Sequence, residues 1–205
     1  MRLQNDGRVS VKINFTKEPE EVRLWRSLQW DLAEFFFAFE RAPGNLYDRF
    51  FDKFSASALL SLRVATLNYD RLLQLAARHR QIELCYSRKP NLAEPLALCL
   101  PHGASYLAPT ARAVVTGNGL VLSGSGEIAG LIPSLDGPLL ELKDLYDLRS
   151  RRNEFFPPAM SYIDPDKLTG SGQSFLLHQR EVWCSWLRQA NRVALVGVRA
   201  FHLLV

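Results

Sequence analysis

Short apolar runs alternate with helical patterns along most of the chain. Runs rich in strand-forming residues lie at 60–66, 82–86, 96–100 and 193–197, and amphipathic helical spacing separates several of them. Because connections of this length can cross over a sheet, the alternation predicts an α/β fold with one mainly parallel sheet flanked by helices. The chain has 205 residues, of which 47% are hydrophobic, and this fits one domain over 1–205.

The clearest helical pattern begins near Pro19 and ends before Pro43. A stripe of this kind usually packs in the core, so we predict a core helix, with a partner-binding face as the alternative. Upstream, alternation over 9–15 predicts a short peripheral strand. The apolar positions of the helix recur at intervals of three and four residues and are Val22, Trp25, Leu28, Leu32, Phe35, Phe36 and Phe39.

Glycine and proline divide the rest of the sequence. A Gly-Asn-Gly turn at 117–119 lies between two β-rich runs and predicts a hairpin. Pro138 is predicted to start a helix that ends in a cluster of arginines at 149–152. Residues 153–172 are predicted to form a long loop, and 173–191 a last helix.

Two polar turns interrupt the predicted strands. Asn-Tyr-Asp at 68–70 leads into a helical pattern, and Pro-His-Gly at 101–103 ends the third strand-like run. Open α/β sheets bind ligands at the carboxyl ends of their strands, so we expect both turns to face one cleft. His102 is the favoured general base, because an imidazole near its unperturbed pKa accepts a proton at neutral pH. The alternative is a turn histidine hydrogen-bonded to backbone.

Asn68 and Asp70 have two interpretations that can hold together. An asparagine amide offers both a donor and an acceptor, which suits a ribose hydroxyl or a water molecule. Either side chain can also accept a hydrogen bond from the first turn of the following helix. A capped turn is in addition a rigid place for a binding site.

Charge and cysteine content limit which partners, metal sites and compartments are expected. The net charge of +4 is mildly basic, but the arginines are scattered, so nucleic-acid binding is not indicated and an anionic cofactor fits equally well. Cys85, Cys99 and Cys184 form no CxxC pair, which excludes a four-cysteine zinc module and predicts reduced thiols. No segment has the pattern of a signal peptide or a membrane span, so a cytoplasmic protein is expected.

Four short motifs follow one another along the chain: TLNYD at 66–70, LPHG at 100–103, FFPPAMSY at 155–162 and VALVGVR at 193–199. In this order and spacing they resemble the Sir2-like (sirtuin-related) NAD-binding domain over about 60–199. The chain is more similar to the bacterial Sir2-like NAD hydrolases than to the zinc-containing deacylases. The resemblance implies a Rossmann-like fold and hydrolysis of NAD to nicotinamide and ADP-ribose, a reaction that bacterial relatives use in antiphage defence.

The resemblance also implies roles for individual residues. Asn68 would position the ribose and the attacking water, Asp70 would hydrogen-bond the nicotinamide carboxamide, and His102 would act as general base through a ribose hydroxyl. NAD is the implied substrate, without zinc. Further contacts to NAD are implied for Thr66, Tyr69, Gly103, Gly197 and Arg199.

Two departures from the family pattern open alternatives. No glycine-rich phosphate loop precedes residue 60, and the chain stops at Val205, soon after the last strand-like run. An incomplete Sir2-like domain is therefore expected, either a weak NAD hydrolase or an inert binding and assembly module. NAD-dependent protein deacylation is a third hypothesis, less favoured because the zinc module is missing. Besides NAD, the partners considered are a second copy of the chain and a partner protein domain.

Overall fold

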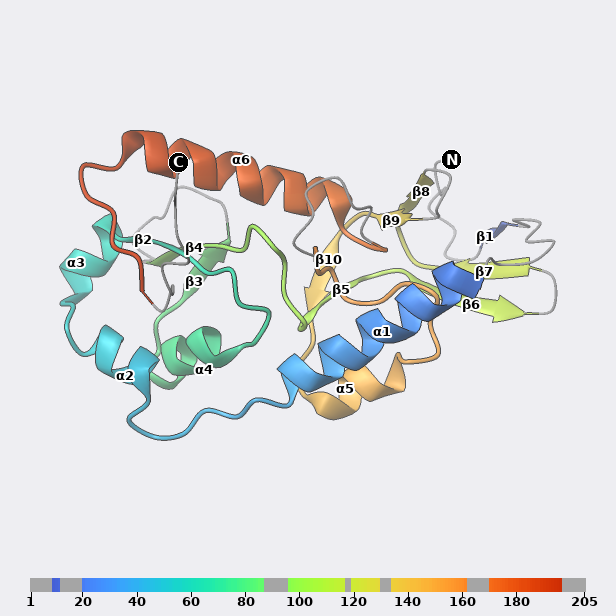
Figure 1. The fold of residues 1–205 in the computed structure, drawn as a ribbon, viewed down its shortest axis with the longest axis horizontal. Coiled ribbons are helices and arrows are strands. Elements are labelled where there is room, and N and C mark those ends of the chain that lie inside the picture. Colours follow the sequence, from blue (N-terminus) through green and yellow to red (C-terminus); the bar gives the residue numbers. More distant parts are fainter. Residues whose placement is uncertain are drawn as a thin grey trace.

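The computed structural model describes residues 9–11, 20–86, 96–116, 119–129, 134–161 and 170–196, and its ribbon is shown in Figure 1. The helices are α1 (Glu20–Phe37), α2 (Leu46–Phe51), α3 (Ala56–Ser61), α4 (Leu72–His79), α5 (Leu145–Ser150) and α6 (Gln173–Gln189). The strands are β1 (Val9–Val11), β2 (Arg63–Ala65), β3 (Leu84–Tyr86), β4 (Leu96–Cys99), β5 (Leu107–Pro109), β6 (Arg112–Thr116), β7 (Gly119–Ser123), β8 (Glu127–Ala129), β9 (Ser134–Asp136) and β10 (Leu139–Glu141).

Three of the predicted strands form a small parallel sheet. Its order is β2-β4-β3, so the strand latest in the sequence lies in the centre. Val64 of β2 lies beside Leu98 of β4, whose other neighbour is Tyr86 of β3. Together with the helices, this sheet makes the described part of the chain a mixed α/β structure, as predicted.

The fourth predicted strand, at 193–197, is wrong over its described part. Residues 193–196 follow α6 without forming a strand. Val193, Leu195 and Val196 are 56%, 79% and 81% exposed. An apolar run becomes a strand only where a sheet edge receives its backbone, and a sequence pattern does not show where such an edge lies. Gly197 lies outside the described residues.

Helices lie on both sides of the parallel sheet. In Figure 1, α6 runs along one side and α4 and α2 lie on the other. The face of α4 that packs inward carries Leu73, Ala76 and Ala77, which are buried. Spacing of three and four residues places these side chains on one stripe of the helix, which explains why the sequence pattern located α4 correctly.

Antiparallel pairs make up the rest of the strands. The sheet β1-β7-β6 contains the predicted peripheral strand and the predicted hairpin, in which Thr116 lies beside Gly119. The helix predicted from Pro138 is wrong over Leu139–Glu141, because these residues form β10 and pair with β5. The helix begins only at α5, after Asp144, whose Oδ1 accepts a hydrogen bond from the Asp147 amide at 2.8 Å.

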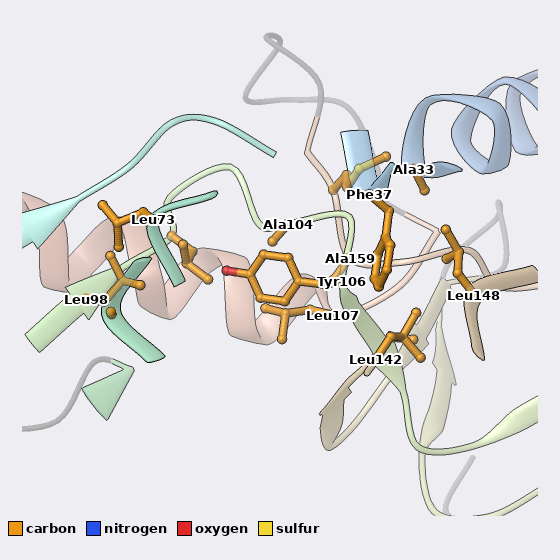
Figure 2. Close-up of a cluster of buried hydrophobic side chains, with 14 of the residues drawn as sticks. Ala33, Phe37, Leu73, Leu98, Ala104, Tyr106, Leu107, Leu142, Leu148 and Ala159 are labelled. Carbon is orange, nitrogen blue, oxygen red and sulfur yellow. The ribbon is translucent and has the colours of Figure 1, made fainter. Parts of the chain in front are cut away.

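The largest group of buried side chains connects the parallel sheet to the region under α1 and α5. Figure 2 shows Tyr106 between Leu73 and Leu98 on one side and Phe37 and Leu142 on the other. Tyr106 is only 1% exposed. One aromatic ring therefore packs against both parts of the core.

Helix α1 is present as predicted, but the side that it turns toward the core is opposite to the predicted core stripe. Its buried side carries Trp30, Ala33 and Phe37. Four residues of the predicted core stripe are exposed instead, so the core interpretation is wrong for Trp25, Leu28, Phe35 and Phe39.

Polar contacts of α1 agree with this rotation. The indole nitrogen of Trp30 donates to the carbonyl oxygen of Glu154 at 3.3 Å. Arg149 and Arg152, at the end of α5 and just after it, pair with Glu34 at 2.7 and 2.5 Å, and Arg152 also pairs with Asp31. Trp30 and Glu34 lie on the side of α1 away from the aromatic stripe, and burial of Trp30, Ala33 and Phe37 on that side leaves the stripe pointing outward.

A buried glutamine joins α6 to the central strand. Gln179 is fully buried, and its side-chain oxygen accepts a hydrogen bond from the Leu100 amide at 2.7 Å. Its carbonyl oxygen also accepts a hydrogen bond from the thiol of Cys99 at 2.9 Å, and burial raises the pKa of that thiol to about 12. The glutamine thus provides a partner for the backbone amide at the point where β4 ends.

We expect Gln179→Leu to lower the free energy of unfolding by about 1 to 3 kcal/mol, because the buried Leu100 amide loses its acceptor. Urea unfolding of the whole chain measures this change. The matched control is Gln189→Leu, on the same helix at an exposed position, which should change stability by less than about 0.5 kcal/mol. Equal midpoints for the two variants would contradict the assigned role of Gln179.

Candidate functional site

The two predicted site loops leave neighbouring strands at the same edge of the parallel sheet. Ala65 of β2 is in register with Cys99 of β4. The amide of Thr66 donates to the carbonyl oxygen of Cys99 at 3.1 Å, which extends the pairing one residue further. Because the strands are parallel, the turns that follow them lie side by side.

The first turn is held by its own polar side chains. The hydroxyl of Thr66 accepts a hydrogen bond from the Asn68 amide at 3.2 Å. Asp70 accepts one from the Leu72 amide at 2.9 Å and so caps the start of α4. This confirms the capping interpretation for Asp70, whose pKa is raised because burial disfavours the carboxylate.

Asn68 reaches a residue that the sequence did not single out. Its side-chain nitrogen donates to the hydroxyl of Tyr47, on α2, at 3.2 Å. The pKa of Tyr47 is raised, first by burial and second by the negative charge of Asp70. Sequence reasoning did not identify Tyr47, because one aromatic residue among several near Phe50 and Phe51 carries no local signal of this contact.

The second turn contacts the first through His102. The imidazole is half-buried, and its ring centroid lies 6.3 Å from that of Tyr69. Burial lowers the pKa of His102, and the positive charge of Arg180 lowers it further. Both causes favour the neutral imidazole, which is the form that can accept a proton.

Gly103 allows a third segment to approach. Its φ is +78°, and a Cβ at this position would lie 1.9 Å from the carbonyl oxygen of Ala159. On either side of the glycine, the Ala104 amide donates to Ala159 at 2.9 Å and the Ser161 amide donates to His102 at 2.8 Å. The FFPPAMSY motif therefore lies against the turn that carries His102, as far as its described residues extend.

Arg180, on α6, contacts both the turn that carries His102 and the segment that contains Ser161. Its guanidinium donates to the carbonyl oxygen of Pro101 at 3.3 Å and to the hydroxyl of Ser161. The phenol of Tyr69 donates to the carbonyl oxygen of the same serine. Sequence reasoning missed Arg180 and Ser161, because a single arginine in a helix and a serine in a proline-rich loop carry no local signal of such contacts.

Six of the eight predicted NAD-contacting residues lie in these two turns; they are Thr66, Asn68, Tyr69, Asp70, His102 and Gly103. Gly197 and Arg199 lie outside the described residues. Two cavities lie elsewhere: one of about 500 Å³ next to Gly126 and Ser174, and one of about 350 Å³ between Arg23 of α1 and Phe155.

The described residues contain no group of three histidine, cysteine or acidic side chains that could hold a metal ion. Cys85 and Cys99 are buried, Cys184 is exposed, and all three are free thiols. No helix within the described ranges combines the length and the apolar character that crossing a bilayer requires.

Comparison of the chain with protein-family models, with curated proteins and with solved structures finds no match.

The lowered pKa of His102 should appear as a pH dependence of stability. Between the folded pKa and the unfolded pKa of about 6.5, the unfolded chain binds more protons than the folded chain. The contribution of His102 is therefore complete above about pH 6.5 and is lost as the pH falls through the folded pKa. We expect urea unfolding to show a smaller loss between about pH 7.5 and about pH 5 for His102→Gln than for wild type.

His178→Gln is the matched control for this measurement, because His178 is exposed on α6. It should keep the wild-type pH dependence. An equal loss of stability in wild type and in His102→Gln would show that the folded state does not disfavour the imidazolium.

We expect Gly103→Ala to destabilise the protein by more than about 3 kcal/mol, from the clash with Ala159 added to the left-handed backbone conformation. Gly44→Ala separates the two causes, because Gly44 has φ +70° and no heavy atom within 4 Å of the added Cβ. That control should lose only about 1 to 2 kcal/mol. Similar losses in the two variants, measured by urea unfolding, would rule out the close contact with Ala159.

Proposed function

We propose that the turns after β2 and β4 form the ribose and nicotinamide site of a Sir2-like NAD hydrolase, within a Rossmann-like domain. The observation that supports this most is the contact between the two turns. The centroid of the His102 ring lies 6.3 Å from that of Tyr69, the residue next to Asn68, and the Ser105 amide donates to the carbonyl oxygen of Tyr69 at 2.9 Å. An imidazole and an amide side chain therefore come from turns at the same edge of the sheet. The role in bacterial antiphage defence that the resemblance implies belongs to the same proposal.

The proposed reaction needs a base that is uncharged at neutral pH. The bond between the nicotinamide nitrogen and the ribose carbon breaks, and its electron pair goes to the ring nitrogen. A water oxygen bonds to the ribose carbon, and its proton passes through a ribose hydroxyl to the neutral His102 and then to solvent. Asn68 orients the ribose and the water, since its amide can donate and accept at once.

Asp70 acts in this proposal by orienting the nicotinamide carboxamide. One of its oxygens accepts from the Leu72 amide, which fixes the carboxyl group at the start of α4. The other oxygen then offers an acceptor for the carboxamide N–H group. The raised pKa of Asp70 fits a partly desolvated carboxyl group at the edge of a ligand site.

The two turns offer few groups for the pyrophosphate. Neither 66–70 nor 101–103 contains a lysine or an arginine. Charge-assisted hydrogen bonds to phosphate are each worth roughly 1.5 to 3 kcal/mol, so a site without several of them binds a dinucleotide weakly. We therefore propose slow hydrolysis that requires a high concentration of NAD.

An inert binding or assembly module is the second candidate function. It is favoured by the fact that the polar side chains of the site already have structural partners, Asp70 in the cap of α4 and Asn68 on Tyr47. Such contacts stabilise the turn whether or not a substrate binds. An assay of activity is therefore needed to choose between the two.

We expect nicotinamide release to be slow in wild type and to fall by about 100-fold or more in His102→Ala and in Asn68→Ala, because each removes a group that acts on the reacting ribose. The assay measures free nicotinamide across micromolar to millimolar NAD. His178→Ala, the same change at an exposed position of α6, should leave the rate unchanged. Turnover that survives both site substitutions would remove these residues from the mechanism. Absence of turnover at all NAD concentrations would favour the inert module.

A further inference from the structure

Helix α1 presents a row of large apolar side chains to solvent. Leu24, Trp25 and Phe35 are 59%, 50% and 57% exposed, and Leu28 and Phe39 are 43% and 37% exposed. Aromatic side chains each present roughly 150 to 250 Å², so this row exposes on the order of 500 Å² of apolar surface. A patch of this size is comparable to the largest apolar patch of a typical monomer, and such patches are often functional. We call Trp25, Leu28, Leu32, Phe35 and Phe39 the α1 stripe; Phe39 lies two residues after the end of α1 at Phe37.

The spacing along the α1 stripe is that of a coiled-coil seam. Trp25, Leu28, Leu32, Phe35 and Phe39 follow one another at intervals of three, four, three and four residues. This spacing fills the a and d positions of a heptad, so it matches the surface of another helix crossing at a shallow angle. Leu32, in the middle, is partly exposed.

The α1 stripe is not an accidental consequence of a loosely attached helix. The ion pairs of Glu34 with Arg149 and Arg152 and the hydrogen bond from Trp30 hold the opposite side of α1 against the fold. Rotation of the helix to bury the stripe would break these contacts. Within the part of the chain that the structure describes, the stripe stays exposed.

We propose that α1 pairs antiparallel with α1 of a second copy of the chain. In this orientation Leu28 can face Phe39 and Leu32 can face Phe35, so each aromatic ring meets a smaller side chain. The opposed helix dipoles add to the attraction. Two stripes together bury about 1,000 Å², which is at the lower limit for a specific interface and fits a weak homodimer.

Charge does not oppose this self-association. The described positions beside the seam are Leu24, Gln29, Asp31, Phe36 and Ala38. Only Asp31 is charged, and its carboxylate is paired with Arg152. A second copy therefore meets no like charge along the seam, whereas a strongly charged partner helix would find no complementary charges there.

The α1 stripe also extends toward the candidate functional site. Phe36 lies with its ring centroid 5.3 Å from that of Tyr69, which in turn lies 6.3 Å from that of His102. Phe35 and Phe39 contact Phe36 edge to face. The homodimer would place the second copy close to this edge of the site.

Sedimentation equilibrium of the whole chain, from about 1 µM to about 500 µM, tests the proposal. We expect a reversible monomer–dimer equilibrium in wild type and a monomer throughout in Phe35→Arg. Tyr146→Arg places the same change at an 81% exposed aromatic on α5 and should keep the wild-type equilibrium. A monomeric wild type overturns the proposal and assigns the stripe to another partner. A dimer that survives Phe35→Arg, or is lost in Tyr146→Arg, also overturns it.

Spin labels at Leu24→Cys test the orientation, in a background where the exposed Cys184 is replaced by serine. With Leu32 facing Phe35, the two labelled positions are 19 residues apart along the helix pair, or about 28 Å at 1.5 Å per residue. A parallel pair would bring them to about 10 Å. A measured distance near 28 Å supports the antiparallel pair, and one near 10 Å overturns it. Circular dichroism of each variant checks that α1 and the fold are intact.

Discussion

The hydrogen bond between the Gln179 side chain and the Leu100 amide holds α6 against the end of β4, next to the turn that carries His102. Leu100 is the last residue before the turn that carries His102, and Gln179 is next to Arg180, which reaches the same turn. A buried backbone amide without an acceptor is costly, so this contact, together with the hydrogen bonds from the Cys99 thiol and to Pro101, favours one position of α6 along β4. Movement of α6 would displace Arg180 and with it one cause of the lowered pKa of His102.

The contacts that make the site rigid are also those that would exist without any ligand. Asp70 caps α4, Asn68 reaches Tyr47, and Ser161 receives both Tyr69 and Arg180. Preorganised polar groups are what a hydrolase needs, because a fixed site does not have to be ordered when the substrate arrives. The same contacts equally describe a stable turn. A structural role and the proposed catalytic role therefore require the same contacts of these residues. Only an assay of the reaction at the ribose distinguishes the two roles.

Short sequence patterns predicted the three parallel strands and the two turns that follow β2 and β4. The segment after Pro138 and the rotation of α1 depend on contacts between residues far apart in sequence. A β-rich run, a polar turn and a helical pattern follow one another directly in the sequence. Residues 66–70 were therefore predicted correctly as the turn between a strand and a helix. The segment after Pro138 became a strand because β5 pairs with it, and Trp25 faces solvent because Trp30, Ala33 and Phe37 occupy the buried side of α1. Tyr47 and Arg180 are distant in sequence from the turns they contact, which is why no pattern identified them.

The contact between Gln179 and Leu100 spans 79 residues, and this has a consequence during synthesis of the chain. The strands β2, β3 and β4 leave the ribosome well before α6, so the parallel sheet can begin to pair while one of its faces is still uncovered. The amide at the end of β4 then stays bound to water until Gln179 emerges. The turn that carries His102 is therefore among the last parts of the described chain to be completed, and a nascent chain halted before α6 would expose an apolar sheet face to chaperones.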